Sequence, residues 1–326
     1  MIKERVRKFI EEERMADSSE YILAAVSGGP DSVCMLMLLK ELGYETEVLH
    51  VHHGLREAAD EDVRFVKALS EKLDVPFLCM QADVKAYAQS EHLSCEEAGR
   101  RLRYAFFEER AEELEKSGKK VKIAVAHNMD DNAETVLFQM FRGSGPKGLC
   151  GIPPVRGRVI RPLLCVKRSE VEEYLASKGQ DFRIDESNAT NDYTRNRIRH
   201  IILPAANEQI NSKSTEHIAG SAGMLREAED YIEDALREAY TVNIRMEDGI
   251  AHINKEGFKG LHPYIQKRLL LMVMQEVCGS ARDITATHLR LFAELFGMET
   301  GKVLDMPHRM LARCERKEIL LMNKGR

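Results

Sequence analysis

The chain has 326 residues, of which 44% are hydrophobic, so it is long and apolar enough to bury a sizeable core and its length is typical of two domains. Its net charge of −5 excludes a protein that coats nucleic acid through its overall charge. Any contact with nucleic acid therefore has to use a local basic patch.

The cysteines and the apolar segments exclude further classes of protein. The 7 cysteines contain no CxxC pair, which argues against a disulfide framework and against a four-cysteine zinc site. The N-terminal stretch 1–15 is charged throughout, which excludes a secretory signal. The longest apolar run, 33–39, is far shorter than the roughly 20 residues of a membrane helix. We therefore expect a cytoplasmic protein without a membrane partner.

In the first half of the chain, short apolar segments alternate with amphipathic ones. The apolar segments are typical of strands buried on both faces: 21–26, 46–52, 76–81 and 122–126. The amphipathic segments have the period of helices: 31–42, 60–73 and 94–116. A last strand is expected at 159–164, after a loop rich in glycine and proline. The alternation predicts an α/β fold with a doubly wound, mainly parallel sheet and all strand-to-helix loops at one edge.

The second half of the chain has a different pattern of residues. A polar and then basic segment at 187–213 leads into a long amphipathic helix. Short strands and two helices follow, with further β segments from 302 to 322. We predict a first domain at 1–213, a linker helix at 214–240 and a smaller α+β domain at 241–326.

The turn SGGPDS, at Ser27–Ser32, joins the first strand to its helix. Gly28 and Gly29 have no Cβ, so the backbone can approach a ligand closely, and the free N–H groups of a helix start attract anions. Asp31 beside such a site is explained by a divalent cation on the same polyphosphate. The alternative is a tight turn whose helix is capped by Asp31 or Ser32.

A second polar group, HNMDDNAET, follows the fourth predicted strand. Asp131 and Glu134 are three residues apart and share one helix face, and His127 comes just before the helix. By the sheet geometry this group lies near the same edge as the turn at 27–32. Helix capping would explain one acid, but a histidine and several acids together favour a ligand site.

Two arginine groups are candidates for anion binding. Arg100 and Arg103 lie within about one turn of a helix, and Arg195, Arg197 and Arg199 occupy alternate positions with no acid among them. Phosphate or nucleotide binding is one interpretation. The alternative is a solvated surface whose arginines pair with nearby acids.

Taken in order, these motifs resemble a known family. SGGPDS is similar to the pyrophosphatase loop of the N-type ATP pyrophosphatases, which have a Rossmann-like sheet. Over residues 20–205 the set as a whole resembles the bacterial tRNA(Ile)-lysidine synthases: SGGPDS, HHGLR, RRLRY, HNMDDNAET, GSGPKGLCGI, RPLL, and DESN followed by RNRIR. Asn132 stands where a glutamine is common in that family.

The resemblance implies an ATP-dependent ligase. ATP would adenylylate the C2 oxygen of the wobble cytidine of a CAU-anticodon tRNA(Ile), and the ε-amine of free L-lysine would then displace AMP to give lysidine. The first domain would be the ATP-pyrophosphatase catalytic domain, and the smaller one would contact tRNA. ATP and Mg²⁺ are the implied cofactors, and the oligomeric state stays open, a homodimer being the default.

The resemblance also implies roles for individual residues. The turn would hold the phosphates through Ser27, Gly28, Gly29, Pro30, Asp31 and Ser32. Asp31 and Asp131 would bind Mg²⁺. Arg199 and either Arg100 or Arg103 would stabilise negative charge on the α-phosphate and pyrophosphate.

Two assignments are left open between alternatives. Asp131 with Glu134 would hold either the α-ammonium or the ε-amine of lysine. His127 would bind the α-phosphate or act as an acid or base.

Two other functions are compatible with the fold. A tRNA thiolase of the same superfamily would need reactive cysteines, often in a CxxC pair, and here Cys79, Cys150 and Cys165 would have to act singly. A nucleotide-binding or RNA-binding module without turnover would not need the full set of acids. Basic residues of the second half are candidates for tRNA contact, although each is more often simply solvated: Lys255, Lys259, Lys267, Arg268 and Arg309.

Overall fold

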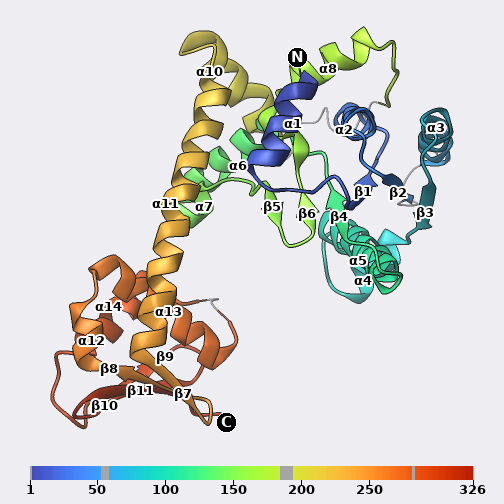
Figure 1. Cartoon of the computed structure of the whole chain (residues 1–326). Helices are drawn as coiled ribbons and strands as arrows, with labels where there is room; N and C mark the ends of the chain where they lie inside the picture. The colour runs from blue at the N-terminus through green and yellow to red at the C-terminus, as the bar shows by residue number, and fades with distance from the viewer. Residues whose placement is uncertain (1, 53–58, 184–193, 281–282, 326) are drawn as a thin grey trace. The chain divides into compact units, whose positions relative to one another are not determined.

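The computed structural model describes residues 2–52, 59–183, 194–280 and 283–325 (Figure 1). The chain forms two compact units, 1–225 and 226–326. They divide within one long helix, α11 (Ser214–Asn243), and the predicted boundaries at 213 and 240 stay predictions. Among the described residues, no helix combines the length and the apolar character that crossing a membrane requires.

The first unit is built on a mainly parallel sheet, as predicted. Its strands are β1 (Tyr21–Ala25), β2 (Thr46–His52), β3 (Phe77–Gln81), β4 (Val121–Ala124), β5 (Val155–Arg156) and β6 (Val159–Ile160). Their spatial order is β3-β2-β1-β4-β6-β5, and only the edge strand β5 pairs antiparallel. The order reverses between β1 and β4, so their carboxyl ends border the crevice in which such folds bind ligands.

Helices cover both faces of this sheet. They are α1 (Ile2–Glu12), α2 (Pro30–Glu41), α3 (Ala59–Lys72), α4 (Val84–Ser90), α5 (Cys95–Lys116), α6 (Met129–Phe141), α7 (Pro146–Leu149) and α8 (Arg168–Ser177), followed by α9 (Thr194–Arg197) and α10 (Leu203–Gln209). Alternate residues of a strand point to opposite faces. Ile22 and Ala24 of β1 therefore pack in the core formed with α1, α2 and α8, whereas Tyr21 and Leu23 pack with α4 and α5.

The predicted last strand, 159–164, is wrong beyond Ile160. The strand consists of Val159–Ile160 alone, and a short 3₁₀ helix, η1 (Pro162–Cys165), follows it. Proline has no N–H to donate to a sheet ladder, and its fixed φ suits the first position of a helix. The helix α4 was not predicted; Asp83 caps it by accepting a hydrogen bond from the Ala86 N–H at 2.9 Å.

The second unit is the predicted α+β structure. Its sheet is antiparallel, in the order β7-β8-β11-β10-β9. The strands are β7 (Ile244–Glu247), β8 (Ile250–Asn254), β9 (Val303–Met306), β10 (Met310–Cys314) and β11 (Glu318–Asn323), with helices α12 (Lys255–Gly260), α13 (Pro263–Cys278) and α14 (Ala286–Leu295). Phe258 stacks on Phe296 with ring centroids 3.8 Å apart, in a core separate from that of the first unit.

A buried ion pair links the sheet of the first unit to α5. Glu47 of β2 is 4% exposed, and Arg110 of α5 binds both of its carboxylate oxygens, at 2.9 and 3.0 Å. The Tyr21 hydroxyl donates to the same carboxylate at 3.3 Å. Removing one partner of a buried pair leaves an uncompensated charge.

We expect Arg110→Met to destabilise the first unit by about 2 kcal/mol, below the full cost of breaking a buried pair because Arg110 is itself partly exposed. Amides of β2 should then exchange about 30-fold faster in hydrogen–deuterium exchange mass spectrometry. Arg101→Met on the same helix removes an exposed pair with Glu97 and should cost less than about 1 kcal/mol. Equal exchange in the two variants would contradict the assigned role.

Candidate functional site

The turn after β1 leaves the start of α2 open. Ser32 Oγ donates to the Gly29 carbonyl at 2.9 Å and accepts from the Ser27 N–H at 3.2 Å, so this hydroxyl stabilises the turn itself. The helix begins at Pro30, and its N-cap Gly29 provides no side-chain acceptor. Neither Asp31 nor Ser32 caps the helix, contrary to the simpler alternative. The first-turn N–H groups therefore keep their capacity to bind an anion.

Gly28 is favoured by its backbone conformation, whereas its neighbours leave ordinary van der Waals room for a Cβ. Its φ of +94° lies in the region that side chains with a Cβ rarely adopt. A Cβ there would lie 3.4 Å from Val66 Cγ2 and 3.5 Å from Arg183 Cγ. The Gly28 carbonyl accepts a hydrogen bond from the Arg183 N–H at 2.9 Å, which fixes the turn from the other side.

Asn128 joins the two halves of the site. It follows β4 and is the N-cap of α6, where its Oδ1 accepts from the Asp131 N–H at 2.9 Å. Asp131 Oδ2 accepts from the Asn128 N–H at 3.1 Å, which completes a capping box. The Asn128 Nδ2 then donates to Asp31 Oδ1 at 2.9 Å. One fully buried amide thus places both carboxylates at the reversal point of the sheet.

The electrostatics of Asp31 suit a cation. Burial raises its pKa above the usual range, Arg168 and Asn128 oppose the rise, and the nearby charge of Asp131 adds to it. Arg168 NH2 lies 3.9 Å from Asp31 Oδ2, which is a loose pair. A carboxylate with only a loose cationic partner, beside a second carboxylate, suits a divalent cation.

Protein ligands alone do not complete a metal site in the described part of the chain. No group of three or more His, Cys, Asp or Glu side chains gathers there in a metal-binding arrangement. Mg²⁺ is usually held by one or two carboxylates together with water and phosphate oxygens. The residues present fit that mode, with the remaining ligands coming from a nucleotide.

Next to this pair, two arginines bind the acids of α6. Glu134, whose side chain is 1% exposed, accepts from Arg199 Nε at 2.5 Å and from Arg195 Nε at 3.0 Å. Arg199 NH2 also donates to Asp131 Oδ1 at 2.7 Å. Burial lowers the pKa of Arg199, but Glu134 and Asp131 outweigh it and raise the pKa above its usual value.

Arg199 lies on η3 (Ile198–Ile202), a π-helical turn between α9 and α10. Arg195 lies on α9, one turn earlier. The structure therefore agrees with the alternative that these arginines pair with acids. The partner Glu134 lies on α6, 61 positions from Arg195 and 65 positions from Arg199 in the chain.

A second group of arginines has no acidic partners among the described residues. Among the described residues neither Arg100 nor Arg103 forms an ion pair, and the Arg100 guanidinium carbon lies 5.4 Å from the centroid of the Tyr104 ring. Arg161, which is 3% exposed, donates from NH1 to the Pro153 carbonyl at 2.6 Å, while its buried Nε has no partner. Arg161 is buried, whereas Arg100 and Arg103 are exposed, and their positive charges without acid partners favour the binding of an anion.

His127 lies between the acidic and the basic groups. Its Nδ1 is buried without a hydrogen-bond partner. Burial lowers its pKa to about 4; Asp131 opposes this shift, and Arg161, Arg195 and Arg100 add to it. In the free protein the imidazole is therefore neutral at physiological pH.

Asn132, the departure from the family pattern, has a structural role. Its Oδ1 accepts from the Ile152 N–H at 2.7 Å and would lie 2.2 Å from a Cβ at Gly151, whose φ is +67°. The amide therefore holds the loop after α7 against α6.

Three residues that we did not predict belong to the site: Asn128, Arg161 and Arg168. Asn128 had a readable signal, since an asparagine followed three residues later by an acid is a helix-start pattern. Arg161 and Arg168 carry no such local signal. Arg195 was a predicted candidate for anion binding, but its pairing with Glu134, 61 positions away, was not specified by any local pattern. Of the predicted motifs, the residues at 53–56 and 185–188 lie outside the described part of the chain.

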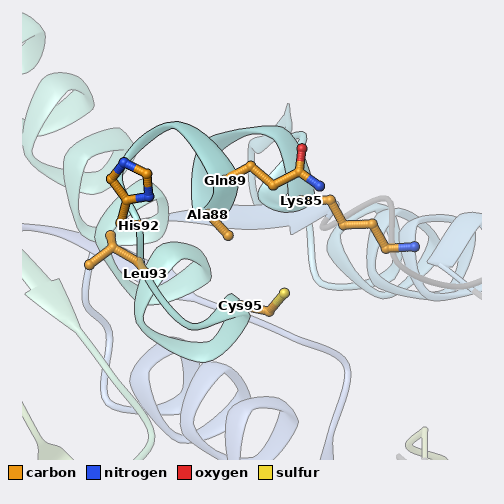
Figure 2. Close-up of a pocket in the computed structure, with 6 residues that line it drawn as sticks. All are labelled: Lys85, Ala88, Gln89, His92, Leu93 and Cys95. Atoms are coloured by element: carbon orange, nitrogen blue, oxygen red, sulfur yellow. The ribbon is translucent and has the colours of Figure 1, made fainter.

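A cavity of about 560 Å³ lies apart from these residues. It is lined by α4 and the start of α5, through Lys85, Ala88, Gln89, His92, Leu93 and Cys95 (Figure 2). None of the predicted site residues lines it, and it has no role in the site described above.

Comparison with known proteins agrees with the geometry. Residues 1–206 match the family model described as a PP-loop domain. The chain is 35% identical to the tRNA(Ile)-lysidine synthase of Dehalococcoides mccartyi, over 98% of this chain and 70% of that protein. It is 33% identical to the tRNA(Ile)-lysidine synthase of Clostridioides difficile, over 99% of this chain and 71% of that protein.

Among solved structures, the U34-tRNA thiolase NcsA from Methanococcus maripaludis, which carries a [4Fe-4S] cluster, superposes with a TM-score of 0.56. The superposition covers 69% of this chain and 78% of that one, at 17% sequence identity. A likeness at that level of identity shows a common fold and nothing finer.

We expect His127 to stay neutral from pH 8 down to about pH 5, because burial disfavours the imidazolium. NMR of the protein labelled with ¹⁵N-histidine reports the protonation state of each imidazole, and the His127→Asn variant identifies the signal. A His127 signal that titrates near pH 6.5, as an unperturbed histidine does, would contradict the assignment.

Proposed function

The chain belongs to the tRNA(Ile)-lysidine synthases, ATP-using ligases of the PP-loop family, and we propose a role in that reaction for each part of its site. The observation that carries the proposal is the contact of Asn128 with Asp31, which places the acids of α6 beside the anion-binding start of α2. Phosphate-binding and amine-binding groups thereby meet at one sheet edge.

The reaction has two steps. In the first, the C2 oxygen of the wobble cytidine of a CAU-anticodon tRNA(Ile) attacks the α-phosphorus of ATP, and pyrophosphate leaves. In the second, the ε-amine of free L-lysine attacks C2, the C2–O bond breaks, and AMP leaves while the amine loses its proton. Lysidine, AMP and pyrophosphate are the products.

The turn at Ser27–Ser32 would hold the β- and γ-phosphates. The open N–H groups of α2 point to this role, since Gly29 at the N-cap provides no side-chain acceptor. Asp31 and Asp131 would hold Mg²⁺, which would supply charge neutralisation on the phosphate oxygens. The acid-free arginines Arg100 and Arg103 would face the charge that develops on the α-phosphate and pyrophosphate.

The acids of α6 would bind the lysine substrate. An ammonium group has a pKa near 10.4 in water, so it arrives charged and has to lose a proton before its nitrogen can attack. Glu134, buried and within one helix turn of Asp131, would hold an amino group of lysine. His127, neutral in the free protein, has a buried ring nitrogen that can accept a proton or a hydrogen bond.

Contacts with tRNA outside the nucleotide pocket would involve the second unit. Two of the candidate basic residues already have intramolecular partners: Arg268 binds Glu229 and Glu233 at 2.5 and 2.6 Å, and Lys255 Nζ lies 3.1 Å from Cys314 Sγ. The exposed candidates that carry this role are Lys259, Lys267 and Arg309.

The alternative, a thiolase, gains no support from the cysteines. Burial raises the pKa of Cys79 and raises that of Cys165 to about 12, so both thiols stay protonated at neutral pH. Cys150 is buried. A sulfur-transfer enzyme needs a reactive thiolate or a cluster of cysteines, and these three thiols provide no such arrangement.

We expect Asp31→Asn to lower tRNA-dependent ATP–pyrophosphate exchange at least 100-fold, because the variant loses the carboxylate charge opposite the metal and phosphates. Asn keeps the size of the side chain, so circular dichroism should be unchanged. Asp83→Asn is the matched control, since asparagine also caps a helix and Asp83 lies on α4. Exchange at the control's rate in Asp31→Asn would refute the metal role.

Glu134→Gln should separate the two steps. We expect the KM for lysine to rise about tenfold or more, because the variant loses the charge that holds an amino group. Pyrophosphate exchange, which needs no lysine, should stay within about threefold of the unaltered protein. The control is Glu113→Gln, an exposed acid on α5. An unchanged lysine KM in Glu134→Gln would remove this residue from the lysine site.

A further inference from the structure

The acids proposed to bind lysine are already occupied in the free protein. Both oxygens of Glu134 accept from guanidinium groups, Oε1 from Arg199 and Oε2 from Arg195. Asp131 Oδ1 accepts from Arg199 and its Oδ2 from the Asn128 N–H. With a further contact from Arg199 NH2 to Oε2 at 3.3 Å, the charge of Glu134 is already neutralised, so an incoming ammonium group has to compete with an arginine for it.

The two arginines differ in how easily they can leave. The Arg195 side chain is 47% exposed and contacts Asp131 only loosely, at 3.8 Å. The Arg199 side chain is 24% exposed and binds Glu134 and Asp131 together. Arg195 can therefore turn toward solvent or toward a phosphate without unfolding its helix, whereas Glu134, which is almost completely buried, cannot follow it.

The two substrates compete for the partners of one network. This network consists of two cations, Arg195 and Arg199, and two anions, Asp131 and Glu134, so its net charge is zero. ATP brings negative charge, which attracts the arginines; lysine brings positive charge, which needs the acids. If ATP alone drew Arg195 away, the buried Glu134 would lose one of its two counter-charges; if lysine bound alone, it would have to displace Arg195 from Glu134 with no anion to receive that arginine. When both bind, each charge finds a new partner.

We propose that Arg195 makes the binding of lysine depend on ATP, by occupying Glu134 until the nucleotide's phosphates draw its guanidinium away. This inference rests on the proposed function, because it takes Glu134 as part of the lysine site. Arg195 acts here as a positioning residue, since in the free protein it acts on lysine through Glu134.

The proposal has a thermodynamic consequence. If ATP tightens the binding of lysine by some factor, lysine has to tighten the binding of ATP by the same factor. Couplings between two ligand sites are typically about 5-fold to 150-fold. We expect at least a tenfold effect, because the carboxylate whose partner is exchanged, that of Glu134, is buried.

Isothermal titration calorimetry with the full chain tests the proposal without turnover. L-Lysine is titrated into the protein alone, and into the protein saturated with Mg²⁺ and α,β-methylene-ATP, which cannot release pyrophosphate. We expect the lysine Kd to fall at least tenfold with the analogue. The reciprocal titration of the analogue, with and without lysine, should show the same factor.

Variants assign the effect to Arg195. In Arg195→Met, Glu134 Oε2 keeps only the longer contact with Arg199 NH2 at 3.3 Å, so lysine should bind the protein alone more tightly and the ratio of the two Kd values should fall below about threefold. Arg195→Lys keeps a cation that can pair with Glu134 and should retain most of the ratio. Arg158→Met is the matched control, because Arg158 also bridges two acids, Glu108 and Glu115, outside the site.

The outcomes are distinct. Equal lysine affinities with and without the analogue in the unaltered protein would overturn the coupling, and lysidine formation by that protein would leave the proposed function standing. A full ratio in a folded Arg195→Met would overturn the role of Arg195. Absence of lysine binding under both conditions, together with absence of lysidine formation, would overturn the proposed function and this inference with it.

Discussion

The site depends on one buried amide. Asn128 caps α6 with its oxygen and donates from its nitrogen to Asp31 on α2, so the helices that follow β1 and β4 are fixed to each other at their first turns. Because Asn128 is completely buried, water cannot replace either hydrogen bond. The spacing between the phosphate turn and the acids of α6 follows from this contact and from the pairing of β1 with β4.

Around that contact, charge is sorted into two groups. The acids of α6 are neutralised by Arg195 and Arg199, whereas Arg100, Arg103 and Arg161 have no acid partner in the described part of the chain. Arg161 is buried, so its unpaired charge is unfavourable, and the exposed Arg100 and Arg103 leave further positive charge available to an anion. Charge sorted in this way suits a reaction whose substrates are a polyphosphate and a diamine.

The scaffold gives this arrangement its rigidity. The core strands of the first unit carry side chains in two apolar cores, one on each face of the sheet, and Glu47 inside one face is neutralised by Arg110. The loops at the carboxyl edge lie outside the two cores and are free to carry polar chemistry. The second unit has its own core, so its folding does not have to depend on the nucleotide site.

Patterns in the sequence determined that the sheet is mainly parallel, the order of its strands and helices along the chain, the glycine turn and the family. These features depend on residues near each other in the chain: apolar periodicity, a glycine at a positive φ, an acid one helix turn from another. The misplaced end of the last strand and the unpredicted α4 show the limit even there, since short segments near proline or a capping aspartate have weak periodicity.

The tertiary structure alone decided which charges meet. Asn128 contacts Asp31 across 97 positions, and Arg199 reaches Asp131 across 68. Such pairs follow from which strands are neighbours and from where each helix starts, and side-chain type alone does not specify them. A sequence shows that arginines and acids are present, but only the folded chain, through burial and distance, determines which of them neutralise each other and which remain for a ligand.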